Sequence, residues 1–333
     1  MRLGVVIAAA GALLAACGGS SSSNSITLYN GQHQQTTLAL VARFEKLTGI
    51  SVNVRSNDER ALAAQLAAEG SGSPADVIYS ENSPTLEYLQ NKGLLVPVTP
   101  STLARTPSRY DSPQGAWVGV SGRVSVLVYN TQELKPSQLP TSVMQLAQPQ
   151  WKGKLAFAAA ETDFQPVVTT VARTYGNAAA LRWLEGLKAN AVRIYPDNET
   201  VTDQVNRGQA PIGLIDQYYW YRQRAQVGAS GMHSAIAYFA PHDPGYVIDV
   251  SGAAVLKSSR HQAAAQKFLA FLVSAQGQEI IAHSDSFEYP IASGVKTAQP
   301  ETPFNRLRPF PIGVGALGDG STALALLQKA QLL

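Results

Sequence analysis

The chain is poor in several features that mark particular classes of protein. It has one cysteine, Cys17, in 333 residues, so a disulfide framework is excluded. Its 26 Lys and Arg against 23 Asp and Glu give a formal charge of only +3, which does not predict a nucleic-acid partner. It has only four tryptophans, which disfavours a cleft lined with indoles for stacking on a sugar. After the first 16 residues, no apolar run is long enough to cross a membrane.

Motifs of hydrolytic chemistry are also missing. The sequence contains neither the G-x-S-x-G elbow of α/β-hydrolases nor the H-E-x-x-H helix of zinc proteases. Acyl transfer needs a nucleophile with a base and an oxyanion hole, and no such set stands out. We therefore expect a binding protein and not an enzyme.

The N-terminus has the form of an export signal. Residues 1–16 begin with the basic Arg2 and continue with a short apolar run, as in secretory signal peptides. The run ends in Leu-Ala-Ala-Cys, which resembles the bacterial lipobox, and this predicts lipidation of Cys17. The simpler alternative is a plain signal peptide with an incidental cysteine. Residues 17–24 read as a flexible, lipid-anchored tether, so we expect an exported protein at the outer face of the cytoplasmic membrane or in the periplasm.

The first part of the mature chain alternates between strand and helix patterns. Apolar runs of strand type occupy 26–29, 50–54 and 75–79, and helical patterns lie between them at 36–47 and 62–66. Thr48-Gly49 is expected to end the first helix. Polar or acidic residues follow the strands. This order predicts an α/β lobe whose ligands bind at the carboxyl edge of its sheet.

The second part repeats the alternation after a connecting strand. The run 124–129 is long enough to pass between lobes, and 247–250 followed by 253–256 reads as a return crossing. Two crossings between two α/β lobes form a hinge and a cleft, which predicts the two-lobed, type II periplasmic-binding-protein (Venus-flytrap) fold. The expected bounds are 25–123 plus 250–300 for the N-lobe and 124–249 plus 301–333 for the C-lobe.

Two adjacent phenols, Tyr218 and Tyr219, are the first candidates for chemistry. A phenolate is a hard anionic donor, and a small trivalent cation such as Fe(III) best offsets the loss of its proton. Alternatively, the two rings stack on a sugar or a cationic ligand. We expect the nearby Trp220 and Tyr221 to have packing roles.

Six short motifs, spread in order over the mature chain, carry a family resemblance. They are Tyr29-Asn30-Gly31-Gln32-His33, Ala75-Asp76-Val77-Ile78-Tyr79-Ser80-Glu81, Ser121-Gly122-Arg123, Trp151-Lys152-Gly153-Lys154, Tyr218-Tyr219-Trp220-Tyr221 and Ser251-Gly252-Ala253-Ala254-Val255-Leu256-Lys257. Together they resemble the bacterial ferric-ion-binding proteins, the substrate-binding components of iron(III) ABC importers.

The resemblance implies a ligand set for one Fe(III): His33, Glu81, Tyr218 and Tyr219. Each of the four is expected at a strand end or a turn, where a ligand can point into a cleft. Two phenolates and one carboxylate supply three negative charges for a trivalent ion, and a neutral imidazole adds a fourth donor. Taken singly, His33 reads as a solvated turn histidine and Glu81 as a carboxylate at a helix start. Arg123 is expected to orient Glu81 or a bound phenolate.

The chain departs from the family where a small anion, phosphate or carbonate, completes the iron shell. The turn that should hold the anion reads Glu161-Thr162-Asp163-Phe164-Gln165, and Asp216 replaces an asparagine, whereas Asn198 matches a second asparagine. Carboxylates facing the site would repel phosphate. We therefore expect weak phosphate binding, with water, carbonate or a carboxylate in the remaining positions. In an alternative arrangement, Asp163 caps the following helix and faces away, leaving Thr162 and Asn198 as anion contacts.

The resemblance also implies partners. The expected ligand is Fe(III), and the expected recipients are an ABC permease and its ATPase, with the protein a monomer held to the membrane by its lipid anchor. The main alternative is a binding protein of the same fold for a small organic solute, such as a sugar, a polyamine or a thiamine-like molecule.

Overall fold

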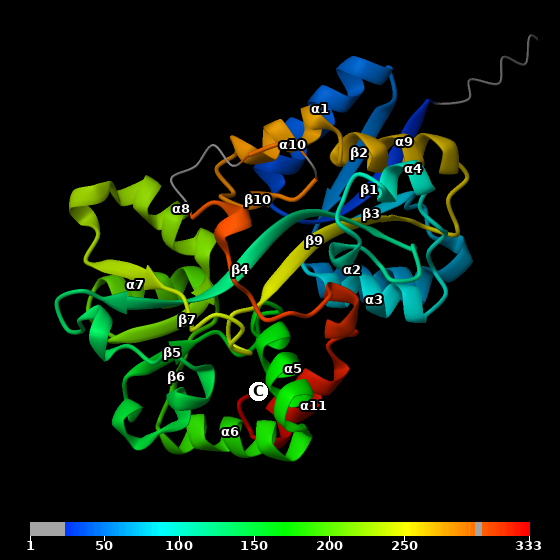
Figure 1. Ribbon diagram of the computed structural model, residues 1–333. Coiled ribbons are helices and arrows are strands. Elements are labelled where there is room, and N and C mark those ends of the chain that lie inside the picture. Colours follow the sequence, from blue (N-terminus) through cyan, green and yellow to red (C-terminus); the bar gives the residue numbers. More distant parts are fainter. Residues whose placement is uncertain (1–23, 293, 297–301) are drawn as a thin grey trace, which may run out of the picture.

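A computed structural model describes residues 24–292, 294–296 and 302–333. The expected signal peptide, Cys17 and all but the last residue of the tether lie outside these residues. The strands join in one mixed sheet in the order β2-β1-β3-β9-β4-β7-β5-β6, with β8 and β10 also paired to β4 (Figure 1). The strands are β1 (Ser25–Gly31), β2 (Ser51–Ser56), β3 (Val77–Ser80), β4 (Val118–Asn130), β5 (Leu155–Phe157), β6 (Arg193–Ile194), β7 (Ile212–Asp216), β8 (Ser234–Ala237), β9 (Ile248–Val255) and β10 (Tyr289–Pro290).

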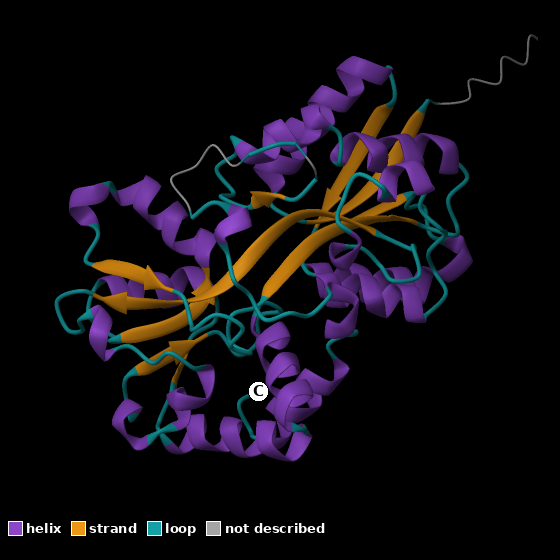
Figure 2. Cartoon of the chain, viewed as in Figure 1, coloured by secondary structure: helices purple, strands orange, loops and turns teal. Residues whose placement is uncertain are grey.

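Helices cover both halves of this sheet (Figure 2). They are α1 (Gln34–Thr48), α2 (Glu59–Glu69), α3 (Ser83–Asn91), α4 (Pro100–Leu103), α5 (Phe164–Tyr175), α6 (Asn177–Ala189), α7 (Asn198–Asn206), α8 (Gln217–Val227), α9 (Gln262–Leu272), α10 (Ala275–Ala282) and α11 (Ser321–Lys329). In Figure 1, α1, α9 and α10 lie above the β1–β3 end, and α2 and α3 lie below it.

The fold has two lobes, as the sequence predicts, and β4 runs through both. Its first half pairs with β9 from Val118 to Val124, and its second half pairs with β7 and β8 from Ser125 to Asn130. The helix α11 packs on α5 and α6, so the C-terminus returns to the second lobe.

The two crossing strands differ in extent from the sequence prediction. The strand expected at 124–129 begins at Val118, and the two runs expected within 247–256 form one strand, β9. Gly252 separates those runs without interrupting the strand. A β-carbon at Gly252 would lie 2.9 Å from the carbonyl oxygen of Val118 and 2.7 Å from Leu86, so glycine permits the close approach of β9 and β4.

Local signals at the first helix agree with the structure. The stop expected at Thr48-Gly49 is confirmed, since Gly49 has the left-handed conformation (φ 67°) and its N–H donates to the carbonyl oxygen of Glu45. Apolar residues of α1 and α9, among them Phe44 and Phe268, pack with β1 and β3 in one core cluster.

Among the described residues, no helix has both the length and the apolar character that a membrane crossing requires.

Candidate functional site

His33 and Glu81 meet at the carboxyl edge of the first lobe's sheet. Strands β1 and β3 are parallel neighbours, with Gly31 opposite Ser80, so the residues that follow them are brought together. His33 lies just before α1 and Glu81 just after β3. Their side chains approach with 3.9 Å between Nε2 of His33 and Oε1 of Glu81. The sequence places both at strand ends, and the structure agrees.

Tyr218 and Tyr219 occupy the first turn of α8 and not the turn or strand end that the sequence suggests. Strand β7 ends at Asp216 and α8 begins at Gln217, so no loop separates the two elements. The two phenol rings are buried, with their centroids 4.0 Å apart and an angle of 31° between their planes. The helix start holds both rings side by side.

Each phenol donates a hydrogen bond to a carboxylate. Tyr218 Oη lies 2.8 Å from Glu81 Oε1, and Tyr219 Oη lies 2.8 Å from Asp163 Oδ2. The His33 ring packs against Tyr218, with 5.2 Å between the ring centroids. The four residues that the sequence singles out as ligands therefore converge, and Asp163 joins them.

Burial sets the protonation of this cluster. It raises the pKa of Tyr218 and Tyr219 well above the ordinary value of 10.0, and it also raises the pKa of Glu81 although Arg123 opposes the shift. Burial lowers the pKa of His33 to about 4. At neutral pH and without a cation, the phenols are therefore protonated and the imidazole is uncharged.

The imidazole of His33 has one ring nitrogen that no described residue contacts by a hydrogen bond. His33 Nε2 is buried and has no hydrogen-bond partner among the described residues. A buried nitrogen lone pair without a partner is costly unless something binds it. Within residues 24–292, 294–296 and 302–333, no three His, Cys, Asp or Glu side chains are grouped closely enough to hold a metal ion.

Arg123 and Glu288 form a buried ion pair behind the site. Both side chains are at most 1% exposed, and Nη2 of Arg123 lies 2.5 Å from Oε1 of Glu288. The other arm of the guanidinium donates to the carbonyl oxygen of Glu81 and, at 2.9 Å, to Oδ1 of Asn82. Arg123 thus fixes the backbone of Glu81, and its guanidinium carbon lies 5.8 Å from the centre of the Tyr218 ring.

Glu288 is also connected to His33, through the side chain of Gln32. Its carboxylate accepts hydrogen bonds from Gln32 Nε2 at 3.1 Å and from Ser121 Oγ at 2.8 Å. Oε1 of Gln32 in turn accepts the backbone N–H of His33 at 2.6 Å. Sequence reasoning misses Glu288, because it stands outside every motif and is 256 positions from Gln32 along the chain. Only the pairing of β10 with β4 brings it to the site.

Asp163 does not cap α5, so the alternative in which it faces away is wrong. Its side chain makes no capping hydrogen bond within the part of the chain that the structure describes. Its carboxylate instead accepts from Tyr219, from Nδ2 of Asn82 at 3.1 Å and from Nδ2 of Asn198 at 3.1 Å. Thr162 is close by, since its hydroxyl accepts a hydrogen bond of 2.8 Å from Asn82.

Two more carboxyl groups lie near these residues. Burial raises the pKa of Glu161 to about 7, with the charge of Asp163 adding to the shift. Burial also raises the pKa of Asp216, whose Oδ2 lies 4.0 Å from Nε of Arg123. At neutral pH both groups are therefore ionised less than ordinary surface carboxylates.

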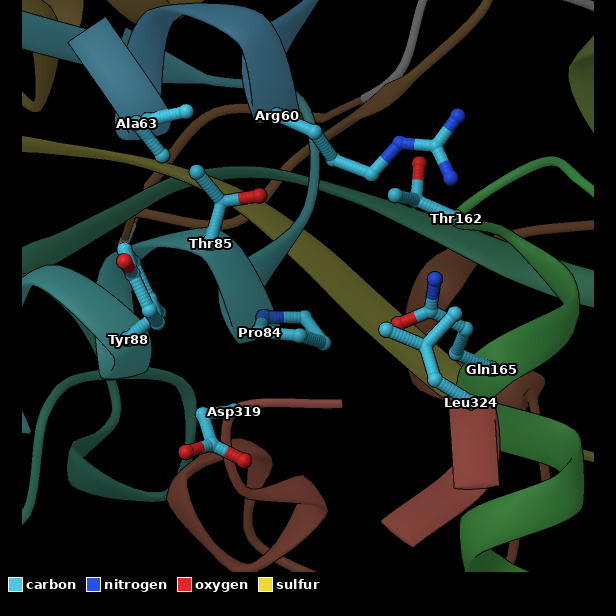
Figure 3. Close-up of a pocket in the computed structure, with 10 residues that line it drawn as sticks. Arg60, Ala63, Pro84, Thr85, Tyr88, Thr162, Gln165, Asp319 and Leu324 are labelled. Atoms are coloured by element: carbon cyan, nitrogen blue, oxygen red, sulfur yellow. The ribbon is translucent and has the colours of Figure 1, made fainter. Parts of the chain in front are cut away.

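Space remains between the lobes beside the site. A cavity of about 200 Å³ is bounded by α2 and α3 on one side and by α11 and the start of α5 on the other (Figure 3). Arg60 points across it toward Thr162, and Gln165 and Leu324 form the opposite wall. Thr162 separates this cavity from Asn82, to which it is hydrogen-bonded.

Comparison with known proteins identifies the family. Residues 72–309 match the family described as bacterial extracellular solute-binding protein. The chain belongs to this family. It is 36% identical over 308 residues to the Fe(3+)-binding periplasmic protein of Serratia marcescens, covering 92% of this chain and 90% of that protein. It is 35% identical over 308 residues to the major ferric iron-binding protein of Neisseria gonorrhoeae, covering 92% of each.

Solved structures of the family agree in fold. Iron-bound HitA from Pseudomonas aeruginosa matches with a TM-score of 0.87 and 39% identity, over 92% of this chain and 99% of that one. A Trichodesmium protein in complex with iron and citrate matches with a TM-score of 0.82 and 29% identity, over the same shares. These matches confirm the resemblance to ferric-ion-binding proteins and the two-lobed fold. Solute-binding proteins of this kind are transport components.

Proposed function

We propose that this protein is the extracytoplasmic Fe(III)-binding component of an ABC iron importer and has no enzymatic role. Ferric ion would bind between the lobes to Tyr218, Tyr219, His33 and Glu81. The observation that carries the proposal is a pair of buried phenols, one of them hydrogen-bonded to Glu81, beside an imidazole nitrogen that has no hydrogen-bond partner among the described residues. The names of the relatives in Serratia and Neisseria support the same cargo.

The donor set fits a hard trivalent cation. On binding, the two phenol protons would leave to solvent, and the phenolate and carboxylate oxygens would hold the ion. Two phenolates and Glu81 would supply three negative charges, which match Fe(III), while His33 would bind as the neutral imidazole that its lowered pKa favours. The positive charge of the ion offsets the burial that otherwise keeps the phenols protonated.

Closure would couple binding to delivery. We place the lobe boundaries at 25–123 plus 250–300 and 124–249 plus 301–333; the pairing of β10 with the first half of β4 and the packing of α11 on α5 and α6 support them. His33 and Glu81 then belong to one lobe and the tyrosines to the other. Rotation about β4 and β9 would complete the ligand set and present the closed form to a permease and its ATPase.

We also propose that the mature protein is a monomer, exported and held at the membrane through lipidated Cys17. Mass spectrometry of protein extracted from the cell envelope would detect acyl chains on Cys17. An unmodified cysteine, or a mature chain that begins at another residue, would contradict the anchor without affecting the iron site.

Iron loading tests the function directly. Protein loaded with ferric nitrilotriacetate and desalted should retain one iron and show a phenolate-to-iron charge-transfer band in the visible. Tyr218→Phe and Tyr219→Phe should each weaken the band, whereas Tyr175→Phe, on an exposed side chain, should not. A colourless, iron-free wild type would overturn the proposal. Saturable binding of a sugar, polyamine or thiamine by that protein would instead establish an organic-solute binder.

A further inference from the structure

Asp163 is placed against the second phenol in the way that Glu81 is placed against the first. Both phenol-to-carboxylate distances are 2.8 Å. Two oxygen ligands at right angles on an octahedral metal, each about 2.1 Å from it, lie about 3 Å apart. Each tyrosine therefore already has a carboxylate oxygen near the spacing of adjacent ligands on one ion. Glu81 is a proposed ligand, and Asp163 is its counterpart on the other phenol.

The carboxylate of Asp163 is held by amides from both lobes. Asn82, which follows β3, donates to Oδ1, and Asn198, the first residue of α7, donates to Oδ2, each at 3.1 Å. Asn82 is itself fixed by Arg123, which donates to its Oδ1. Asp163 is only 8% exposed, so its carboxylate is kept inside the protein with one oxygen directed at Tyr219. Such a preorganised anion is suited to cation binding.

We propose that Asp163 becomes a fifth protein ligand to the ferric ion once lobe closure draws it and the ligands His33 and Glu81 together around the ion, so that the chain supplies its own anion and needs no free carbonate or phosphate. This inference rests on the proposed function. On binding, the Tyr219 proton would leave to solvent, and Tyr219 Oη and Asp163 Oδ2 would both hold the ion. The two phenolates, Glu81 and Asp163 then place four negative charges around Fe(III).

Charge disfavours a free anion beside Asp163, and the small cavity on the Asn198 side of this carboxylate has no room for one. The cavity that Asp163 and Asn198 line together with Asp216 has a volume of about 10 Å³. That is room for about one water molecule and not for phosphate. A dianion would also add two negative charges to a buried cluster. The ligands of that cluster already carry four negative charges against the three positive charges of the metal.

Wild-type protein gives the first test without any mutation. Iron-loaded protein would be desalted into buffer freed of carbonate and phosphate, and its affinity measured by competition with EDTA, with and without added bicarbonate or phosphate. We expect less than about a 2-fold change in affinity and an unshifted visible band. A gain of about 10-fold or more with either anion would overturn the inference but leave the proposed function intact.

Variants give the second test. Asp163→Ala should weaken iron binding at least about 10-fold and make it dependent on an added carboxylate, so that acetate or bicarbonate restores part of the affinity and of the visible band. Asp163→Asn keeps the shape but not the charge, and should lose affinity and respond little to acetate. Glu185→Gln removes a carboxylate from an exposed position of α6 and should change neither.

Melting of each iron-free variant controls for folding. An Asp163→Ala protein that melts like wild type and binds iron with unchanged affinity would also overturn the inference. A wild-type protein that takes up no iron would refute the proposed function, so the two failures are distinguishable.

Discussion

Replacing Glu288 by Gln should destabilise the iron-free protein and weaken iron binding together. The substitution leaves the guanidinium of Arg123, which is fully buried, without the carboxylate 2.5 Å away. Removing one member of a buried ion pair costs about 3–5 kcal/mol, because the remaining charge stays desolvated. Asp216, 4.0 Å from Nε of Arg123, can take over part of the pairing, so we expect a loss of about 3 kcal/mol in the free energy of unfolding.

The same substitution should also disturb the proposed ligands, because hydrogen bonds connect Glu288 to the backbone of both. Glu288 holds Gln32, which holds the N–H of His33, and it pairs with Arg123, which holds the carbonyl of Glu81. A residue that orients ligands without touching the metal typically accounts for about 10–100-fold in metal affinity. Glu288 is therefore a positioning residue for both ligands of the first lobe, and its loss should shift the visible band as well as the affinity.

The pH dependence gives a further check. Burial works to raise the pKa of Glu288, but Arg123 outweighs it, and the pKa lies below its ordinary value. The stability that Glu288 contributes is therefore present above the pKa of an unfolded glutamate and is lost as the pH falls through the lower folded-state pKa. The difference in stability between wild type and Glu288→Gln should shrink in acid.

Urea denaturation of iron-free protein, followed by circular dichroism, measures the loss. The matched control is Glu279→Gln, whose carboxylate is 57% exposed and pairs with His283 one turn away; it should cost less than about 1 kcal/mol. The reasoning is refuted if Glu288→Gln unfolds at the same urea concentration as wild type and binds iron equally well. Combining it with Arg123→Met should recover part of the loss, since no charge is then left buried.

Three other perturbations have expected outcomes. Phenylalanine at both tyrosines, Tyr218 and Tyr219, should abolish the visible band and weaken iron binding by more than about 100-fold, which titration against EDTA would measure. Because burial lowers the pKa of His33 to about 4, the iron-free protein should lose up to about 3 kcal/mol of stability as the pH falls from 6.5 to 4, and His33→Gln should remove this part of the pH dependence whereas His283→Gln should not. Gly252→Ala should cost about 1–3 kcal/mol in urea denaturation, since its β-carbon would clash with Leu86 and the carbonyl of Val118, whereas Gly72→Ala, with open space around it, should cost little.

Much of the fold follows from local patterns in the sequence. The strand and helix alternation, the stop at Gly49 and the placement of His33 and Glu81 after strands depend on neighbours within a few residues, and the structure agrees with each. The tyrosine pair is identified as a candidate by its chemistry, but its helical setting is not. Aromatic residues are only moderate helix formers. The two tyrosines are helical here because α8 begins at Gln217, immediately after the preceding strand ends.

The surroundings of the site could not be read from the sequence because they depend on pairings between distant segments. Glu288 reaches Gln32 and Arg123 only after β10 joins β4, and Asn82 reaches Thr162 and Asp163 only when the lobes meet. Glutamate and asparagine are ordinary surface residues in isolation, and neither position has a local pattern that marks it. Asp163 shows the same limit, since capping and facing the site are equally compatible with its sequence.

These buried contacts explain how the chain positions two phenols to bind a cation. Each phenol donates a hydrogen bond to a carboxylate. Arg123 fixes the backbone of Glu81, and Asn82 and Asn198 fix the carboxylate of Asp163. Within each phenol–carboxylate pair, replacing the proton by the ion requires little movement, because the two oxygens already stand near the spacing of adjacent ligands. The buried Arg123–Glu288 pair holds this arrangement in place. Replacing Glu288, which does not touch the metal, should therefore still weaken iron binding.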